Sequence, residues 1–225
     1  MKFILLFISI LIINVNLYAG APAPSSSLPE PPYTFQKGTL LTINVEWQKA
    51  SIKKYFPEVN ELGDIIRGGI DIYFTKYKKP LTKIDYAIMW VNLDNDEKKI
   101  ILAFVGPDYD SNRLIEKITE KNLNLSKSRL MLINNKVSFR TNINNKLVFN
   151  LSANLNDKCK TDNQVQKRMR KSNNNKFFII MSNAELSCEI NNIDLLFSEK
   201  YNDIKIIKIL SGSLFKNTEV IFNIN

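Results

Sequence analysis

Short segments of alternating apolar and polar residues recur along most of this 225-residue chain. The clearest spans residues 41–47, where Leu, Ile, Val and Trp alternate with Thr, Asn and Glu. A period of two places successive side chains on opposite faces of a strand, so this segment predicts a half-buried β-strand. Comparable segments predict further strands at residues 70–76, 84–93, 100–105, 129–133, 137–142, 147–155, 177–181, 184–190, 204–210 and 219–223.

Turn and helix signals separate these strands. The tetrapeptide Ile-Asn-Asn-Lys occurs at 133–136 and again at 143–146. Asparagine tolerates positive φ, so both copies predict tight hairpin turns. A short helix is expected at 50–56, ended by Pro57, and the main helix at 111–122 after Asp110 or Ser111. About ten short strands and one main helix predict a mainly β (α+β) fold, a single-domain antiparallel β-barrel or curved sheet.

The N-terminal segment has the features of a signal peptide. Lys2 precedes an apolar run over residues 3–13, and small residues follow at Ala19 and Ala21. We expect a signal peptide at residues 1–19, cleaved after Ala19 or Ala21, and an exported (periplasmic or secreted) protein. The alternative is a membrane-anchored N-terminus, although the apolar run is shorter than a bilayer span and no later segment is long enough. Residues 20–37 form a Pro/Ser-rich tether, and the β domain covers 38–225.

Two cysteines, Cys159 and Cys188, are present in the whole chain. In the oxidising environment outside the cytoplasm such a pair is expected to form one disulfide. Two buried free thiols are the alternative interpretation.

The chain contains no histidine. This excludes the Ser-His-Asp and Cys-His relays and every zinc site that uses imidazole, and two cysteines alone cannot form a four-cysteine site. With seven glycines and no glycine-rich phosphate-binding motif, nucleotide-dependent chemistry is also disfavoured. We therefore expect no metal and no cofactor, and any covalent chemistry must use groups such as lysine.

Basic residues concentrate in one segment. Residues 157–176 contain seven basic and two acidic side chains. This segment is either a solvated loop or a site for an acidic partner. No nucleic acid is expected, because the interleaved aromatic residues of single-strand binders are absent. Homo-oligomerisation is compatible with the sequence. The basic patch comprises Lys167, Arg168, Arg170, Lys171 and Lys176.

Lys127 is the candidate for amine chemistry. It follows the expected main helix and precedes the strand at 129–133. In an extended chain Arg129 projects to the same side as Lys127, and a neighbouring cation or desolvation activates an amine. The alternative is an ordinary surface lysine at a helix–strand junction.

The order of these elements resembles the acetoacetate decarboxylase-like family over residues 38–225. The C-terminal run, with Ala-Glu-Leu at 184–186, Gly-Ser-Leu-Phe at 212–215 and Glu-Val-Ile at 219–221, is similar to the closing strands of that fold. The family carries Gly-x-Pro-Lys before a strand, and its lysine forms a Schiff base. Residues 124–127 read Asn-Leu-Ser-Lys, so only Lys127 matches. Ser128 stands where the family has a second lysine, and Asp85 lies in the region of the family's Tyr-x-Glu.

The resemblance implies two functions. In the first, the exported protein is a carboxy-lyase acting on a small β-keto acid or related carbonyl acid. Lys127 would form the Schiff base, Arg129 would activate it, and Glu120 or Asp85 would act as acid–base partner. In the second, the barrel is a catalytically inactive ligand-binding or interaction domain, and the basic 157–176 loop contacts an acidic partner.

Overall fold

The computed structural model describes residues 33–75, 84–93, 98–106, 123–156, 158–161, 166–172, 175–182 and 184–224. Its elements are β1 (Tyr33–Gln48), α2 (Lys49–Ile52), η1 (Pro57–Glu61), β2 (Ile65–Phe74), β3 (Asp85–Asn92), β4 (Lys98–Val105), β5 (Leu123–Leu125), β6 (Lys127–Ile133), β7 (Lys136–Ile143), β8 (Lys146–Leu155), β9 (Gln166–Ser172), β10 (Asn175–Ser182), β11 (Leu186–Phe197), η3 (Glu199–Tyr201) and β12 (Ile206–Ile224). The predicted signal peptide and the helix expected at 111–122 lie outside the described residues.

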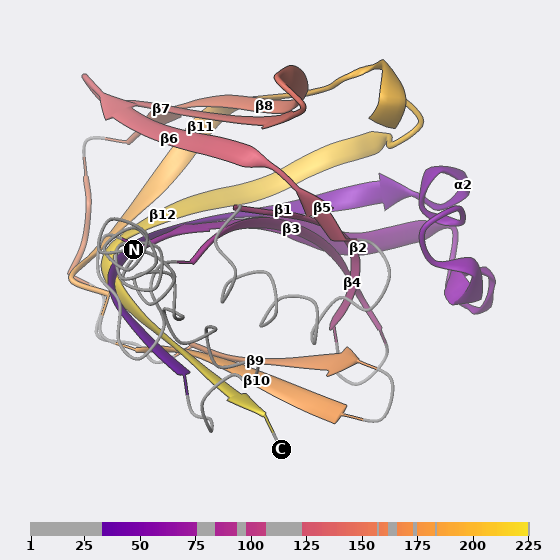
Figure 1. Ribbon diagram of the computed structural model, residues 1–225, viewed down its shortest axis with the longest axis horizontal. Helices are drawn as coiled ribbons and strands as arrows, with labels where there is room; N and C mark the ends of the chain where they lie inside the picture. The colour runs from indigo at the N-terminus through magenta and orange to yellow at the C-terminus, as the bar shows by residue number, and fades with distance from the viewer. Residues whose placement is uncertain are drawn as a thin grey trace, which may run out of the picture.

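Seven strands close into a barrel in the order β1-β2-β3-β4-β9-β10-β12, because β12 pairs with both β10 and β1 (Figure 1). The predicted mainly β architecture is confirmed. Among the described residues the sheet has twelve strands, and it is mixed rather than wholly antiparallel, since β4 pairs in parallel with β5 and β9. β1 starts at Tyr33, ahead of residue 38 where the sequence predicts the domain to begin, because Tyr33 and Phe35 pair with β12 and are buried.

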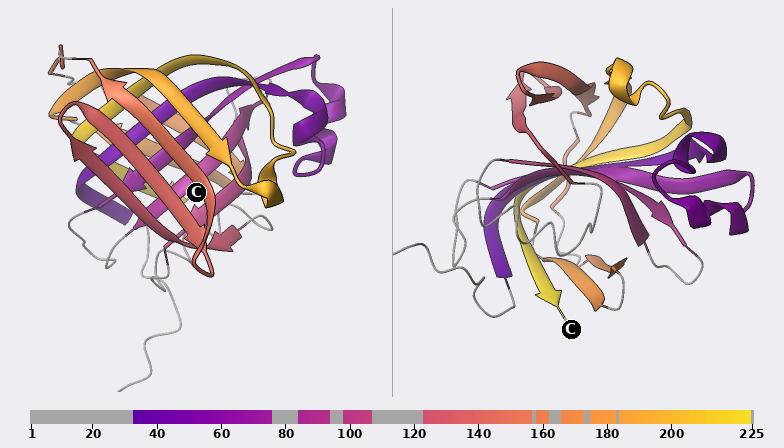
Figure 2. Two further views of the ribbon diagram at one scale, coloured as in Figure 1. Left: turned by 90° about the horizontal axis from the view of Figure 1, so that it is seen from above. Right: turned by 45° about the vertical axis from the view of Figure 1, so that its right-hand side comes forward.

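A second layer, the upper sheet, consists of β6, β7, β8 and β11 in that order, with β6 at its free edge. β11 connects the two layers, since its first residues pair with β12 and its later residues with β8. Figures 1 and 2 show this layer lying across one side of the barrel wall. Both Asn-Asn turns are confirmed, with positive φ at Asn134, Asn135, Asn144 and Asn145.

Two apolar cores result, because the barrel wall is covered on both faces. The face towards the upper sheet forms the core between the two layers, the interlayer core, in which Leu41, Ile43 and Trp47 of β1 lie in one cluster with residues such as Phe139 and Phe149. The opposite face of the same strands, which we call the inner face, lines the barrel and buries Tyr33, Phe35, Leu40, Tyr73, Tyr86, Phe215 and Phe222. β1 is therefore buried on both faces through its centre, where the alternation predicts a half-buried strand.

Three strand predictions need correction. The two strands expected at 204–210 and 219–223 are one continuous strand, β12, which bends through register shifts opposite β1. The strand expected at 184–190 continues to Phe197 as β11. The basic segment is not simply a loop, because β9 and β10 pair as a hairpin and belong to the barrel wall. In β9, Gln-Lys-Arg-Met-Arg-Lys has no apolar alternation, so its pairing with the apolar β10 could not be recognised from its own sequence.

The predicted disulfide between Cys159 and Cys188 is confirmed, with an S–S distance of 2.08 Å. A backbone bridge between Lys160 and Ser187 lies beside it and ties the segment that follows β8 to β11. A disulfide agrees with a compartment that is oxidising. Within the described part of the chain, none of the helices has the length and apolar character needed to cross a bilayer.

Candidate functional site

The structure places Lys127 and Arg129 at the surface. Both lie on β6, and both are exposed on the side of the upper sheet that is turned away from the barrel, which we call the outer face. The two side chains share a face, as the sequence predicts, but this face is turned away from the barrel. Activation of an amine by desolvation requires a closed, apolar site, and the outer face does not provide one.

The residues on either side of Lys127 point inward instead. Ser126 is 4% exposed, and its hydroxyl donates to the carbonyl oxygen of Val105 over 3.3 Å. The hydroxyls of Ser126 and Ser128 are 3.4 Å apart, and that of Ser128 lies 2.7 Å from the hydroxyl of the fully buried Thr141. Because strand side chains alternate, the register that turns these serines inward is the one that exposes Lys127.

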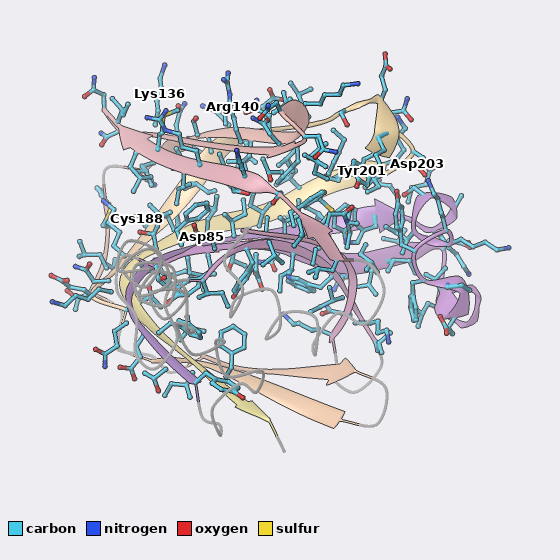
Figure 3. All side chains as sticks on the ribbon, viewed as in Figure 1. Asp85, Lys136, Arg140, Cys188, Tyr201 and Asp203 are labelled. Carbon is cyan, nitrogen blue, oxygen red and sulfur yellow. A yellow bond between two sulfur atoms is a disulfide. The ribbon has the colours of Figure 1, made fainter. Side chains whose placement is uncertain are left out.

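Asp85, at the start of β3, is 7% exposed. Its carbonyl oxygen accepts the N–H of Gly106, and the adjacent Val105 carbonyl accepts the N–H of Ser126. The end of β4 thus brings the backbones of Asp85 and Ser126 close together. In Figure 3 Asp85 lies beneath the upper sheet, whereas Lys136 and Arg140 project from its outer side. The buried Asp85 and the exposed Lys127 do not face one another. Glu120 lies outside the described residues.

Lys127 borders a surface hollow of about 300 Å³. The other lining residues are Leu125, Ser126, Asn142, Asn144 and Asn145. Three asparagines line this open hollow, so it can hydrogen-bond a polar group.

The inner face of the barrel carries a different set of polar side chains. Asp71 on β2 is 2% exposed, and the register places it between Thr42 of β1 and Ile88 of β3. The next row towards one end is aromatic and apolar, with Leu40, Tyr73 and Tyr86 in register. The row towards the other end contains Asn44, Gly69 and Trp90. A buried carboxyl therefore separates an apolar end of the inner face from a polar end.

Lys98 and Trp90 form the polar end of this face. The Lys98 ammonium lies over the Trp90 indole, with Nζ 3.6 Å from the ring centroid. Asn44 donates a hydrogen bond of 2.9 Å to the hydroxyl of Ser211 in the same row. A cation over an indole face is electrostatically favourable and leaves the ammonium oriented towards the ring.

Tyr73 dominates the apolar end. Its hydroxyl donates to the carbonyl oxygens of Phe35, over 3.2 Å, and Thr218, over 3.4 Å. Burial raises the pKa of the Tyr73 phenol, and the nearby Tyr86 and Glu219 raise it further. Tyr73 therefore stays protonated and serves as a hydrogen-bond donor that fixes the chain, not as a proton acceptor.

Sequence reasoning missed the inner-face residues Asp71, Trp90 and Lys98. A signal for Asp71 was available, because a single carboxylate stands between Ile70 and Ile72 in a strand that is otherwise mostly apolar. Trp90 and Lys98 gave no comparable signal, since a lysine at a strand end is ordinary. Among the described residues, no three Cys, Asp or Glu side chains are grouped closely enough to hold a metal ion.

Comparison with solved structures shows that this chain has an acetoacetate decarboxylase-like fold. The chain is similar to a solved acetoacetate decarboxylase with a TM-score of 0.63 at 12% identity, covering 94% of this chain and 96% of the other. It is also similar to acetoacetate decarboxylase from Legionella pneumophila, with a TM-score of 0.65 at 11% identity and 95% coverage of both chains.

Two further solved structures share this fold. One is the enduracididine biosynthesis enzyme MppR complexed with pyruvate, with a TM-score of 0.54 at 10% identity, covering 92% of this chain and 96% of the other. The other is an acetoacetate decarboxylase-like enzyme from Sphingomonas wittichii RW1, with a TM-score of 0.56 at 9% identity and the same coverages. No protein-family model and no curated protein matches the sequence. At these identities the similarity establishes the fold, and function has to be argued from the site.

Proposed function

We propose that this chain is an exported binding protein that holds a small carboxylic acid non-covalently inside its barrel. The observation that carries the proposal is the position of Lys127 and Arg129, which are exposed on the outer face of the upper sheet. A Schiff-base lysine needs a desolvated amine beside the bound substrate. Export is supported by the predicted signal peptide and by the disulfide.

Side chains of the inner face would supply the contacts of such a ligand. Lys98, whose ammonium lies over the Trp90 ring, would pair with the carboxylate of the ligand. Successive rows of one face are about 7 Å apart, so a ligand of three or four carbons reaches from the Trp90 row to the Asp71 row. A ligand with a hydroxyl or enol group would place that group in the row of the buried Asp71. The binding of pyruvate by MppR, a protein of the same fold, supports this ligand class.

Isothermal titration calorimetry of the purified protein with pyruvate, and separately with acetoacetate, tests the proposal. We expect saturable binding that Lys98→Met weakens by roughly tenfold or more, because a charged hydrogen-bond partner is lost. Lys127→Met is the matched control and should bind as the unsubstituted protein does.

Borohydride treatment in the presence of either acid separates the two mechanisms. Non-covalent binding leaves no reduced adduct. A mass adduct on Lys127 that disappears in Lys127→Met would establish Schiff-base chemistry and refute the proposal. Absence of any binding by protein shown to be folded would refute it as well. The function predicted for the basic patch, contact with an acidic partner, stays a prediction.

A further inference from the structure

The outer face of the upper sheet carries a cluster of exposed cations. Lys127 and Arg129 lie on β6, and Lys136 and Arg140 on β7. All four are exposed. Figure 3 shows Lys136 and Arg140 projecting away from the molecule on this side.

The register concentrates like charges. Arg129 lies directly opposite Arg140, and like charges directly opposed across two strands are destabilising. Neither arginine belongs to the two salt bridges found among the described residues, which join Lys54 to Asp203 and Arg67 to Glu46. Among the paired positions of the outer face that the structure describes, Asp194 of β11 is the one acid. The fold tolerates an unneutralised positive surface at this place.

Three aliphatic side chains share the outer face with the cations. Ile133 at the end of β6 is 62% exposed, Leu196 on β11 is 56% exposed, and Leu147 at the start of β8 is 47% exposed. The register places Leu147 in the row of Lys127 and Asn142, and Leu196 in the row of the two arginines. Protein–protein interfaces have an apolar centre and a polar rim. Here the aliphatic side chains occupy the margins, so a folded protein partner fits poorly.

We propose that the outer face docks on a bilayer surface that contains anionic lipid. The four cations would pair with lipid phosphates, while Ile133, Leu147 and Leu196 enter the interfacial layer. A soluble polyanion would neutralise the cations but leave the three aliphatic side chains in water. The attraction between these exposed cations and an anionic lipid surface weakens with salt. This inference uses exposed residues of the upper sheet, whereas the proposed ligand site lies inside the barrel, so the two are independent.

Co-sedimentation with vesicles tests the inference. We expect the full chain to bind vesicles of phosphatidylcholine with phosphatidylglycerol, and not vesicles of phosphatidylcholine alone. Each cation near the surface contributes about fivefold, so the double variant Arg129→Gln/Arg140→Gln should lower the partition coefficient roughly 25-fold. Ile133→Ser/Leu196→Ser should also lower it, which a purely electrostatic contact would not show.

The matched control removes two exposed cations elsewhere, Lys53→Gln/Lys205→Gln, and should retain most of the binding. Equal binding to both kinds of vesicle, or equal losses in the control and the arginine variant, would overturn the inference. Binding to heparin that depends on the arginines, without binding to the acidic vesicles, would assign the outer face to a soluble polyanion instead. All variants are compared after circular dichroism confirms an unchanged fold.

Discussion

Gly68 and Gly69 allow two tryptophans to pack on opposite faces of β2. A Cβ on Gly68 would lie 2.5 Å from Trp47 Nε1, and one on Gly69 would lie 2.6 Å from Trp90 Cζ2. Trp47 Nε1 also donates to the carbonyl oxygen of Trp90 over 3.1 Å. The two glycines thus bring the indole of the interlayer core and the indole of the inner face to within one strand's thickness of each other. The position of Lys98 depends on this packing.

Gly69→Ala should therefore destabilise the protein, by roughly 1–3 kcal/mol for an overpacked site. The added methyl would collide with the carbonyl oxygen of Ile43 as well as with the Trp90 ring. Urea denaturation followed by tryptophan fluorescence measures the change. Gly63→Ala is the control, since nothing lies within 4 Å of a Cβ at that exposed position. Equal stability of the two variants would contradict the packing described for Trp90.

At single residues, the sequence predicted which side chains share a face of a strand better than which of the two faces is buried. That Lys127 and Arg129 share a face follows from the strand period alone and is correct. Which face is buried depends on what covers the strand. The neighbours Ser128 and Leu130 alternate with the two cations, and Leu130 packs against the interlayer core. This short pattern already favoured the exposed position for Lys127, but a functional lysine in a closed site would interrupt the same pattern.

Among the elements, those defined by local chemistry were predictable. Both Asn-Asn turns needed only the tolerance of asparagine for positive φ. β9 and the length of β12 depend on pairing between distant segments, which local sequence does not encode. β12 continues across Gly212, where a Cβ would collide with Ile190 and Ile193 of β11. From the sequence alone, a glycine such as Gly212 suggests the end of a strand. In the structure it is the position at which β12 and β11 approach each other closely.

The disulfide stabilises the junction between the two layers. It joins Cys159, in the segment between β8 and β9, to the fully buried Cys188 of β11. The two cysteines are 29 residues apart in sequence. Closing a loop of this size stabilises a fold by about 3–4 kcal/mol in the loop-entropy model.

Cys159→Ser/Cys188→Ser should lower the free energy of unfolding by about that amount, because the unfolded chain regains the entropy of the open loop. Chemical denaturation of the oxidised protein and of the variant gives the difference. Dithiothreitol should destabilise the unsubstituted protein to a similar degree and leave the double variant unchanged. A further loss in the variant on reduction would show that the reagent acts elsewhere.

For the whole molecule, the strands of the barrel wall are covered on both faces, and this explains why their polar positions could not be interpreted from the sequence alone. The inner face and the interlayer core share the strands β1 to β4, so apolar residues stand on both sides of each strand. Thr42 and Asp71 are consequently buried although they occupy the polar positions of an alternating pattern. A polar position in such a strand indicates the inside of the barrel, where a ligand would be, as readily as it indicates solvent.

Closure of the barrel through β1 and β12 makes a prediction about local stability. The centre of β1, including Leu41 to Val45, is paired on one side with β2 and on the other with β12. Among the strands that the structure describes, β6 pairs with β7 alone. Opening the centre of β1 requires separation of the whole barrel, whereas β6 can detach from the upper sheet alone. Native-state hydrogen exchange should therefore give the β1 amides an opening free energy close to the global free energy of unfolding. The paired amides of β6 should exchange roughly tenfold faster or more. Equal protection in the two strands would show that the upper sheet and the barrel unfold as one cooperative unit.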